Sequence, residues 1–91
     1  MNVMAKYTKD SHIATAEEVL DFFCHIVYDL DINFHPDDDF ADYVNLTTGK
    51  RTMDDEMAAL YNRLMDEAFE AVGEDAVYEI AWNMLEKRLK E

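Results

Sequence analysis

The sequence predicts an all-α fold, a compact bundle of three long helices plus one short helix. Apolar residues recur three and four positions apart in three separate stretches, which is the spacing of one face of a helix. Residues that typically begin or end helices stand at the borders of these stretches. The 91 residues include only two glycines and one proline, so residues 1–91 are expected to form a single domain without linkers.

The first long helix is predicted from about Thr15 to Leu30. Thr15 and Glu18 match the capping box, in which the two side chains accept hydrogen bonds from free N–H groups of the first turn. Residues 1–14, before this cap, have no clear period and are expected to form a flexible N-terminal arm. The predicted apolar face of the helix consists of Val19, Phe22, Phe23, Ile26, Val27 and Leu30.

Three polar residues of this helix, four positions apart, lie opposite the apolar face. They are Asp21, His25 and Asp29, so His25 is expected at the surface, with its charged form stabilised by the two carboxylates. Cys24 is expected to be a small buried apolar residue, because its neighbours in the helix are strongly apolar.

The middle of the chain is predicted to hold the short helix. Pro36 and the three aspartates after it suit a helix start, where carboxylates face the positive end of the dipole. Phe40, Tyr43 and Val44 would form its apolar side. Residues 43–52 then form a small hairpin or a plain loop, and the loop is favoured because an isolated two-stranded hairpin is marginally stable.

Two further long helices complete the prediction. Thr52 is expected to cap the first of them, and Gly73 is expected to end it. The last helix runs from about Glu74 to the end of the chain. Tyr78, Trp82 and Leu89 widen its apolar face beyond half of the circumference, which predicts either a central position or an intermolecular contact.

The charge of the chain is strongly negative. Eight basic and 21 acidic side chains give a net charge of −13. This sign opposes direct binding to nucleic acid and to anionic membranes. Ten acidic residues and no lysine or arginine lie between Asp10 and Gly49, so the N-terminal half carries most of the excess. Such a block either keeps the protein in solution or attracts basic surfaces.

These patterns favour a small, acidic, non-catalytic domain that binds a basic surface on another protein. The binding would imitate the charge of nucleic acid if that surface otherwise holds phosphates. A homodimer through the last two helices is a second expected contact, and no cofactor is expected. The residues expected to bind the basic partner are Asp31, Asp37, Asp38, Asp39 and Asp42.

A divalent metal site is the alternative function for the same stretch. An imidazole nitrogen and several carboxylate oxygens close together in sequence suit a divalent ion. The ligands would be His35, Asp37, Asp39 and Asp42.

Catalysis finds little support in the sequence. The only serine, Ser11, lies in the predicted arm, and the neighbouring Cys24 and His25 project about 100° apart on a helix. A single cysteine excludes an intrachain disulfide, and no apolar run is long enough for a signal peptide or a membrane span. The chain is therefore expected to be a cytoplasmic protein without enzymatic activity.

Overall fold

The computed structural model describes residues 7–44 and 48–90, and it confirms the all-α class. The described part of the chain contains three α-helices, with a single π-helical turn and a single 3₁₀ turn. In chain order the elements are α1 (Ala16–Cys24), the π-helical turn η2 (His25–Asp29), the 3₁₀ turn η3 (Phe40–Asp42), α2 (Asp55–Val72) and α3 (Glu74–Leu89).

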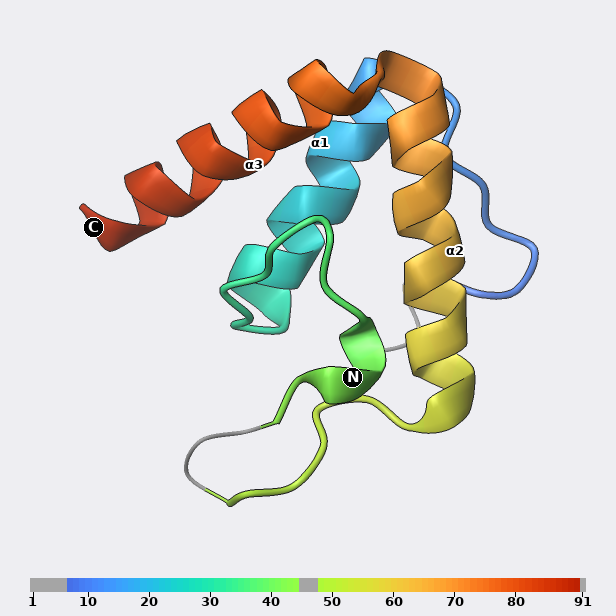
Figure 1. Cartoon of the computed structure of the whole chain (residues 1–91), viewed down its shortest axis with the longest axis vertical. Coiled ribbons are helices and arrows are strands. Elements are labelled where there is room, and N and C mark those ends of the chain that lie inside the picture. The colour runs from blue at the N-terminus through green and yellow to red at the C-terminus, as the bar shows by residue number, and fades with distance from the viewer. Residues whose placement is uncertain (1–6, 45–47, 91) are drawn as a thin grey trace.

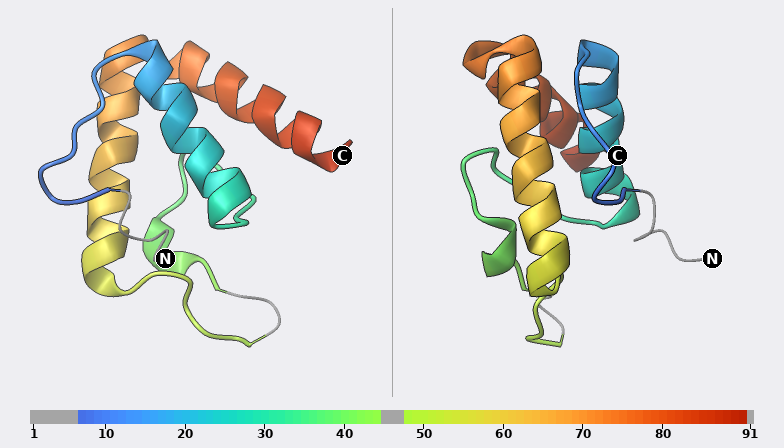
Figure 2. Two further views of the ribbon diagram at one scale, coloured as in Figure 1. Left: turned by 180° about the vertical axis from the view of Figure 1, so that it is seen from behind. Right: turned by 90° about the vertical axis from the view of Figure 1, so that its right-hand side faces the viewer.

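The three helices form a compact globule, as predicted, with a Cα radius of gyration of 12.6 Å, and α3 does not run parallel to the other two helices (Figure 1). Helices α1 and α2 lie side by side, and α3 leaves the end of α2 and crosses over α1 (Figures 1 and 2). The last turns of α3 project away from the other two helices (Figure 1). The first turns of α3 therefore belong to the core, while its last turns extend beyond it.

The core lies between α1 and α2 and is rich in aromatic rings. Five of the predicted apolar positions of the first helix are buried, and Leu30 is half-buried. Burying apolar side chains in this way is the main favourable term in folding. The largest fully buried side chains include Tyr61, Phe22, Phe23, Phe34 and Phe40.

The predicted start of the first helix is confirmed, and its end differs in detail. The Thr15 hydroxyl accepts the Glu18 N–H (3.1 Å), and the Glu18 carboxylate accepts the Ala14 N–H (3.0 Å). Beyond Cys24 the helix widens into the π-turn η2, where the Leu30 N–H donates to the His25 carbonyl (3.0 Å). The helical path therefore extends close to the predicted end, with one wider turn.

Two predictions about the centre of this helix are wrong. Cys24 is exposed, because it lies about 130° around the helix from the centre of the apolar face. His25 is buried, with 1% of its surface exposed. It also lies off the apolar face, but Tyr61 of α2 and Tyr7 of the N-terminal segment pack against its ring and cover it.

Residues 7–14 of the predicted arm have no regular secondary structure, yet they are attached to α2. Ile13 is 5% exposed and belongs to the core. Its N–H donates to Glu67 (2.9 Å), and Arg63 donates to the carbonyls of Lys9 (3.1 Å) and Ser11 (3.0 Å). Residues 1–6 lie outside the described residues.

The middle of the chain is less helical than predicted. Pro36 begins a turn rather than a helix, and the short helix is the single 3₁₀ turn η3, capped by Asp39. Val44 is exposed instead of forming an apolar side. Three aspartates in a row and a buried proline leave too few apolar positions here for a longer amphipathic helix.

The segment 43–52 is mostly a loop, which the sequence favoured over a hairpin. One isolated antiparallel bridge joins Val44 to Arg51, and residues 45–47 lie outside the described residues. The prediction that Thr52 caps α2 is wrong. Asp54 caps the helix, because its carboxylate accepts the Met57 N–H (2.8 Å).

A single residue separates α2 from α3. Gly73 has a positive φ of 88°, a conformation that side chains disfavour, so glycine allows the chain to turn sharply here. This confirms Gly73 as the end of α2, with its N–H donating to the Phe69 carbonyl (2.9 Å). No helix among the described residues is long and apolar enough to span a lipid bilayer.

Candidate functional site

The acidic segment, residues 31–42, contains the five aspartates predicted to bind a partner. Its first part is extended, and its residues alternate strictly between buried and exposed. Ile32, Phe34 and Pro36 point into the core, so the residues between them must face outward. Asp31 and Asp37 are therefore presented to solvent by a backbone that the buried residues hold in place.

The acidic segment runs along α3 in the opposite direction to the helix. At one end, the Arg88 guanidinium donates to Asp31 Oδ1 (2.6 Å). At the other end, the Tyr78 hydroxyl donates to Asp37 Oδ1 (2.6 Å). This hydrogen bond to Asp37 is the main cause that raises the pKa of Tyr78 to about 12. Two residues ten positions apart on α3 thus fix both ends of the extended part.

The chain turns out of η2 at Asp31, the first residue of the acidic segment. This residue has a left-handed backbone (φ 57°), which aspartate adopts more readily than most side chains. The Ile32 N–H then donates back to the Ile26 carbonyl (3.1 Å), in the manner of a glycine-type helix end. The same residue that pairs with Arg88 therefore also turns the chain out of η2.

The other aspartates of the segment support local turns. Asp38 accepts a hydrogen bond from the Tyr43 hydroxyl (3.0 Å). Asp39 accepts from the Ala41 N–H (2.8 Å) and from Asn62 Nδ2 of α2 (2.8 Å), and these two bonds lower its pKa. Asp42 is exposed in η3. All five aspartates remain solvent-exposed, although at least four of them also accept hydrogen bonds within the chain.

The alternative metal ligands are not brought together into a site. His35 Nδ1 accepts the N–H of Asp37 (3.1 Å), and it lies 3.9 Å from the nearer Asp37 oxygen. Within residues 7–44 and 48–90, no three His, Cys, Asp or Glu side chains are placed to hold one ion. The set His35, Asp37, Asp39 and Asp42 therefore receives no structural support as a metal site.

The outer face of α3 is apolar next to this segment. Tyr78, Trp82, Leu85 and Leu89 follow a four-three-four spacing and lie within about 60° of one another around the helix. We call these four residues the α3 stripe. Trp82 is 68% exposed and Leu89 is 80% exposed, whereas Tyr78 and Leu85 are half-buried. Trp82, one turn beyond the Tyr78 that binds Asp37, is therefore a mostly exposed ring on α3.

A network of polar side chains joins η2 to α2. A carboxylate only accepts hydrogen bonds, so His25 Nδ1 donates to Asp29 Oδ2 (3.0 Å). His25 Nε2 then accepts from the Tyr61 hydroxyl (2.6 Å). Burial raises the pKa of Tyr61 and keeps its phenol protonated. Because His25 and Tyr61 are both fully buried, this network satisfies polar groups in the core, and Asp29 is its solvent-exposed member.

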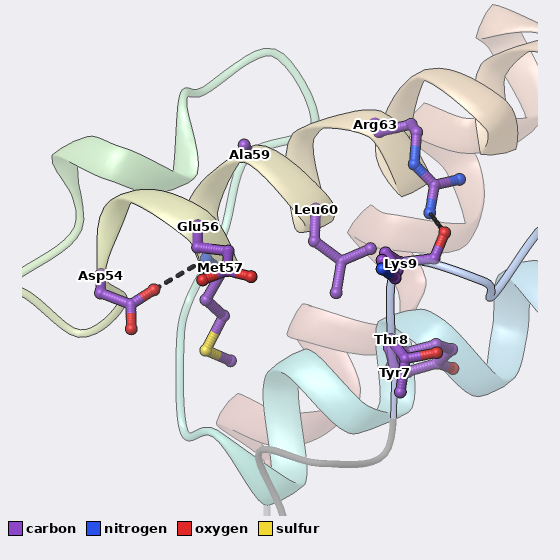
Figure 3. A pocket seen from close by; sticks show the side chains of 9 residues that line it. All are labelled: Tyr7, Thr8, Lys9, Asp54, Glu56, Met57, Ala59, Leu60 and Arg63. Carbon is purple, nitrogen blue, oxygen red and sulfur yellow. Dashed lines mark hydrogen bonds between the residues drawn. The ribbon is translucent and has the colours of Figure 1, made fainter.

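An open pocket of about 700 Å³ lies between the N-terminal segment and the start of α2 (Figure 3). Met57 and Leu60 project from α2 into the space bordered by Tyr7, Thr8 and Lys9 (Figure 3). Its arginine, Arg63, already binds two backbone carbonyls and Glu67. Asp54, a second charged residue of the lining, is committed to capping α2, so two of the charged groups around the pocket already serve contacts within the chain.

The spatial partners of the aspartates could not be identified from the sequence. The alternation of residues 31–37 was visible as a period of two, which indicates an extended segment with one buried side. The sequence contained no comparable signal for the pairs Asp31–Arg88 and Asp37–Tyr78, whose members lie far apart along the chain. Comparisons with protein-family models, curated proteins and solved structures found no match.

Proposed function

We propose that the chain is a non-catalytic interaction domain whose acidic segment binds a basic surface on another protein. The observation that carries the proposal is the fixed outward presentation of Asp31 and Asp37. Buried residues alternate with these carboxylates and hold the backbone, so less conformational freedom is lost on binding than in a flexible acidic tail.

The distribution of charge supports the same proposal. The acidic segment contains five carboxylates and no lysine or arginine, and in the part of the chain that the structure describes Asp31 is the one of the five that forms an ion pair with an arginine or lysine. Exposed carboxylates of one sign accelerate the approach of a basic surface. A finer form of the proposal is that this surface otherwise holds nucleic acid, whose phosphate charge the segment would imitate.

The experiment measures binding of a ten-lysine peptide over a series of salt concentrations. The test variant combines Asp31→Asn, Asp37→Asn and Asp38→Asn, because asparagine keeps an acceptor oxygen for the observed hydrogen bonds. We expect its affinity to fall about tenfold and its salt dependence to become shallower, because each lost contact contributes a few tenths to 1 kcal/mol.

The control removes the same charge elsewhere. It combines Glu17→Gln, Glu56→Gln and Glu70→Gln, which are exposed on α1 and α2. We expect this control to weaken binding of the peptide much less than the test variant does. Equal weakening by both triple variants would contradict the proposal, since it would mean that the peptide responds only to the total charge.

A further inference from the structure

Two residues of the α3 stripe, Trp82 and Leu89, are large apolar side chains that the described fold leaves mostly exposed. Val77 and Ala81 are the buried residues of α3, and they face the core. Trp82 and Leu89 lie outside the core cluster, although both are large enough to contribute substantially if they were buried. The four-three-four spacing of the α3 stripe is the spacing with which one helix packs against another.

Acidic residues flank the α3 stripe on both sides. On one side, Asp31 and Asp37 are held against α3 by Arg88 and Tyr78. On the other side, the helical repeat places three exposed carboxylates within about 100° of the centre of the stripe. These three are Asp75, Glu79 and Glu86.

The basic residues of α3 offset two of these five acids and leave Asp37, Asp75 and Glu79 without a lysine or arginine ion-pair partner among the described residues. Arg88 is already paired with Asp31, and Lys90 is paired with Glu86 (3.0 Å). Lys87 lies on the opposite side of α3 from the stripe. An apolar strip between two acidic rows is complementary to a helix that has apolar residues on one face and lysine or arginine beside them.

We propose that the α3 stripe and the acidic residues on either side form a docking surface for a basic amphipathic helix of the partner. This inference rests on the proposed function and names the class of partner segment. The distance from Tyr78 to Leu89 along α3 is about 16 Å, which is about three turns of a helix. A second copy of the chain is disfavoured as occupant, because it would bring another −13 charge to an acidic surface.

Trp82 allows a direct test, because it is the only tryptophan in the chain. The first probe is a 14-residue peptide of leucine and lysine with the leucines on one helical face. The second has the same composition, with the leucines redistributed so that no apolar face forms. The third is the ten-lysine peptide. We expect the first peptide to shift Trp82 emission to the blue and to bind about tenfold more tightly than the second.

Variants locate the contact. Leu89→Ser is expected to weaken binding of the amphipathic peptide about tenfold and to leave binding of the ten-lysine peptide unchanged. Val44→Ser is the matched control, because Val44 is also exposed but lies outside α3, in the isolated bridge to Arg51. It should leave the affinity for both peptides unchanged.

The outcomes separate this inference from the proposed function. Equal affinities of the two leucine–lysine peptides, with unchanged Trp82 emission, would overturn the docking surface while leaving charge-based binding intact. Failure of all three peptides to bind would overturn both proposals. A dimer in sedimentation equilibrium that Trp82→Ala dissociates would show that a second copy occupies the stripe, and would also overturn the inference.

Discussion

Helices α2 and α3 follow one another across a single glycine, yet their apolar residues have different surroundings. In α2, which has 18 residues, the buried positions are Ala58, Tyr61, Leu64, Met65 and Ala68. In α3, which has 16 residues, only Val77 and Ala81 are buried. Both helices contain apolar residues at three-four spacing. The spacing therefore predicts the helix, while the neighbouring elements determine whether its apolar face is covered.

The largest expected difference between the two helices concerns the same substitution in each. Leu64→Ala in α2 should lower the free energy of unfolding by about 3 kcal/mol, because Leu64 is fully buried and its removal leaves a cavity. Leu89→Ala in α3 should change it by about 0.5 kcal/mol or less, because Leu89 is mostly exposed. Urea denaturation of both variants measures this difference. A loss of about 2 kcal/mol for Leu89→Ala would mean that the end of α3 is covered in the folded protein.

A second comparison removes one hydroxyl from each helix. Tyr61→Phe in α2 leaves the buried Nε2 of His25 without its donor, and we expect a loss of about 2 kcal/mol in unfolding free energy. Tyr78→Phe in α3 removes a donor from Asp37, which water can replace, so a much smaller loss than for Tyr61→Phe is expected. Denaturant unfolding measures both losses. Equal losses would indicate that solvent reaches the His25 network.

A third prediction, with a smaller expected effect than Leu64→Ala or Tyr61→Phe, concerns the attachment of the N-terminal segment to α2 through Glu67. Burial acts to raise the pKa of Glu67, but hydrogen bonds from Ile13, Arg63 and His12 outweigh it and lower the pKa. The stabilising contribution is therefore present above the unfolded-state pKa of about 4.3 and is lost as the pH falls through the folded-state pKa.

Glu67→Gln tests this pH dependence. The variant should be less stable than the parent protein by about 1 kcal/mol at pH 7, because it loses charge-assisted hydrogen bonds. The difference should shrink as the pH falls below about 4. Thermal unfolding across this pH range measures it, with Glu70→Gln, one turn further and exposed, as control. A difference that stays constant with pH would contradict the assigned role of Glu67.

The sequence predicted those parts of the fold that depend on residues close together in the chain. The cap at Thr15, the apolar face from Val19 to Val27 and the helix end at Gly73 are all properties of a few neighbouring residues. His25 was assigned wrongly because its burial depends on Tyr7 and Tyr61, which a single-helix pattern does not include.

The candidate site was predictable only as a set of charges. The aspartates of the acidic segment stand out in composition, but their geometry depends on Arg88 and Tyr78 of a distant helix. The cap of α2 also depends on geometry that the sequence does not specify, although here the competing residues are close together in the chain. Thr52 and Asp54 are both suitable capping residues, and only the backbone of the preceding loop decides between them.

The left-handed turn at Asp31 limits which residues the protein tolerates there. Aspartate, asparagine and glycine adopt this backbone readily, while a β-branched residue would be strained. Of the three tolerated types, only aspartate has a charge that pairs with Arg88. Replacement by asparagine or glycine would therefore keep the path of the chain and remove one charge from the acidic segment. At this position, the shape of the segment and its charge can change independently in related sequences.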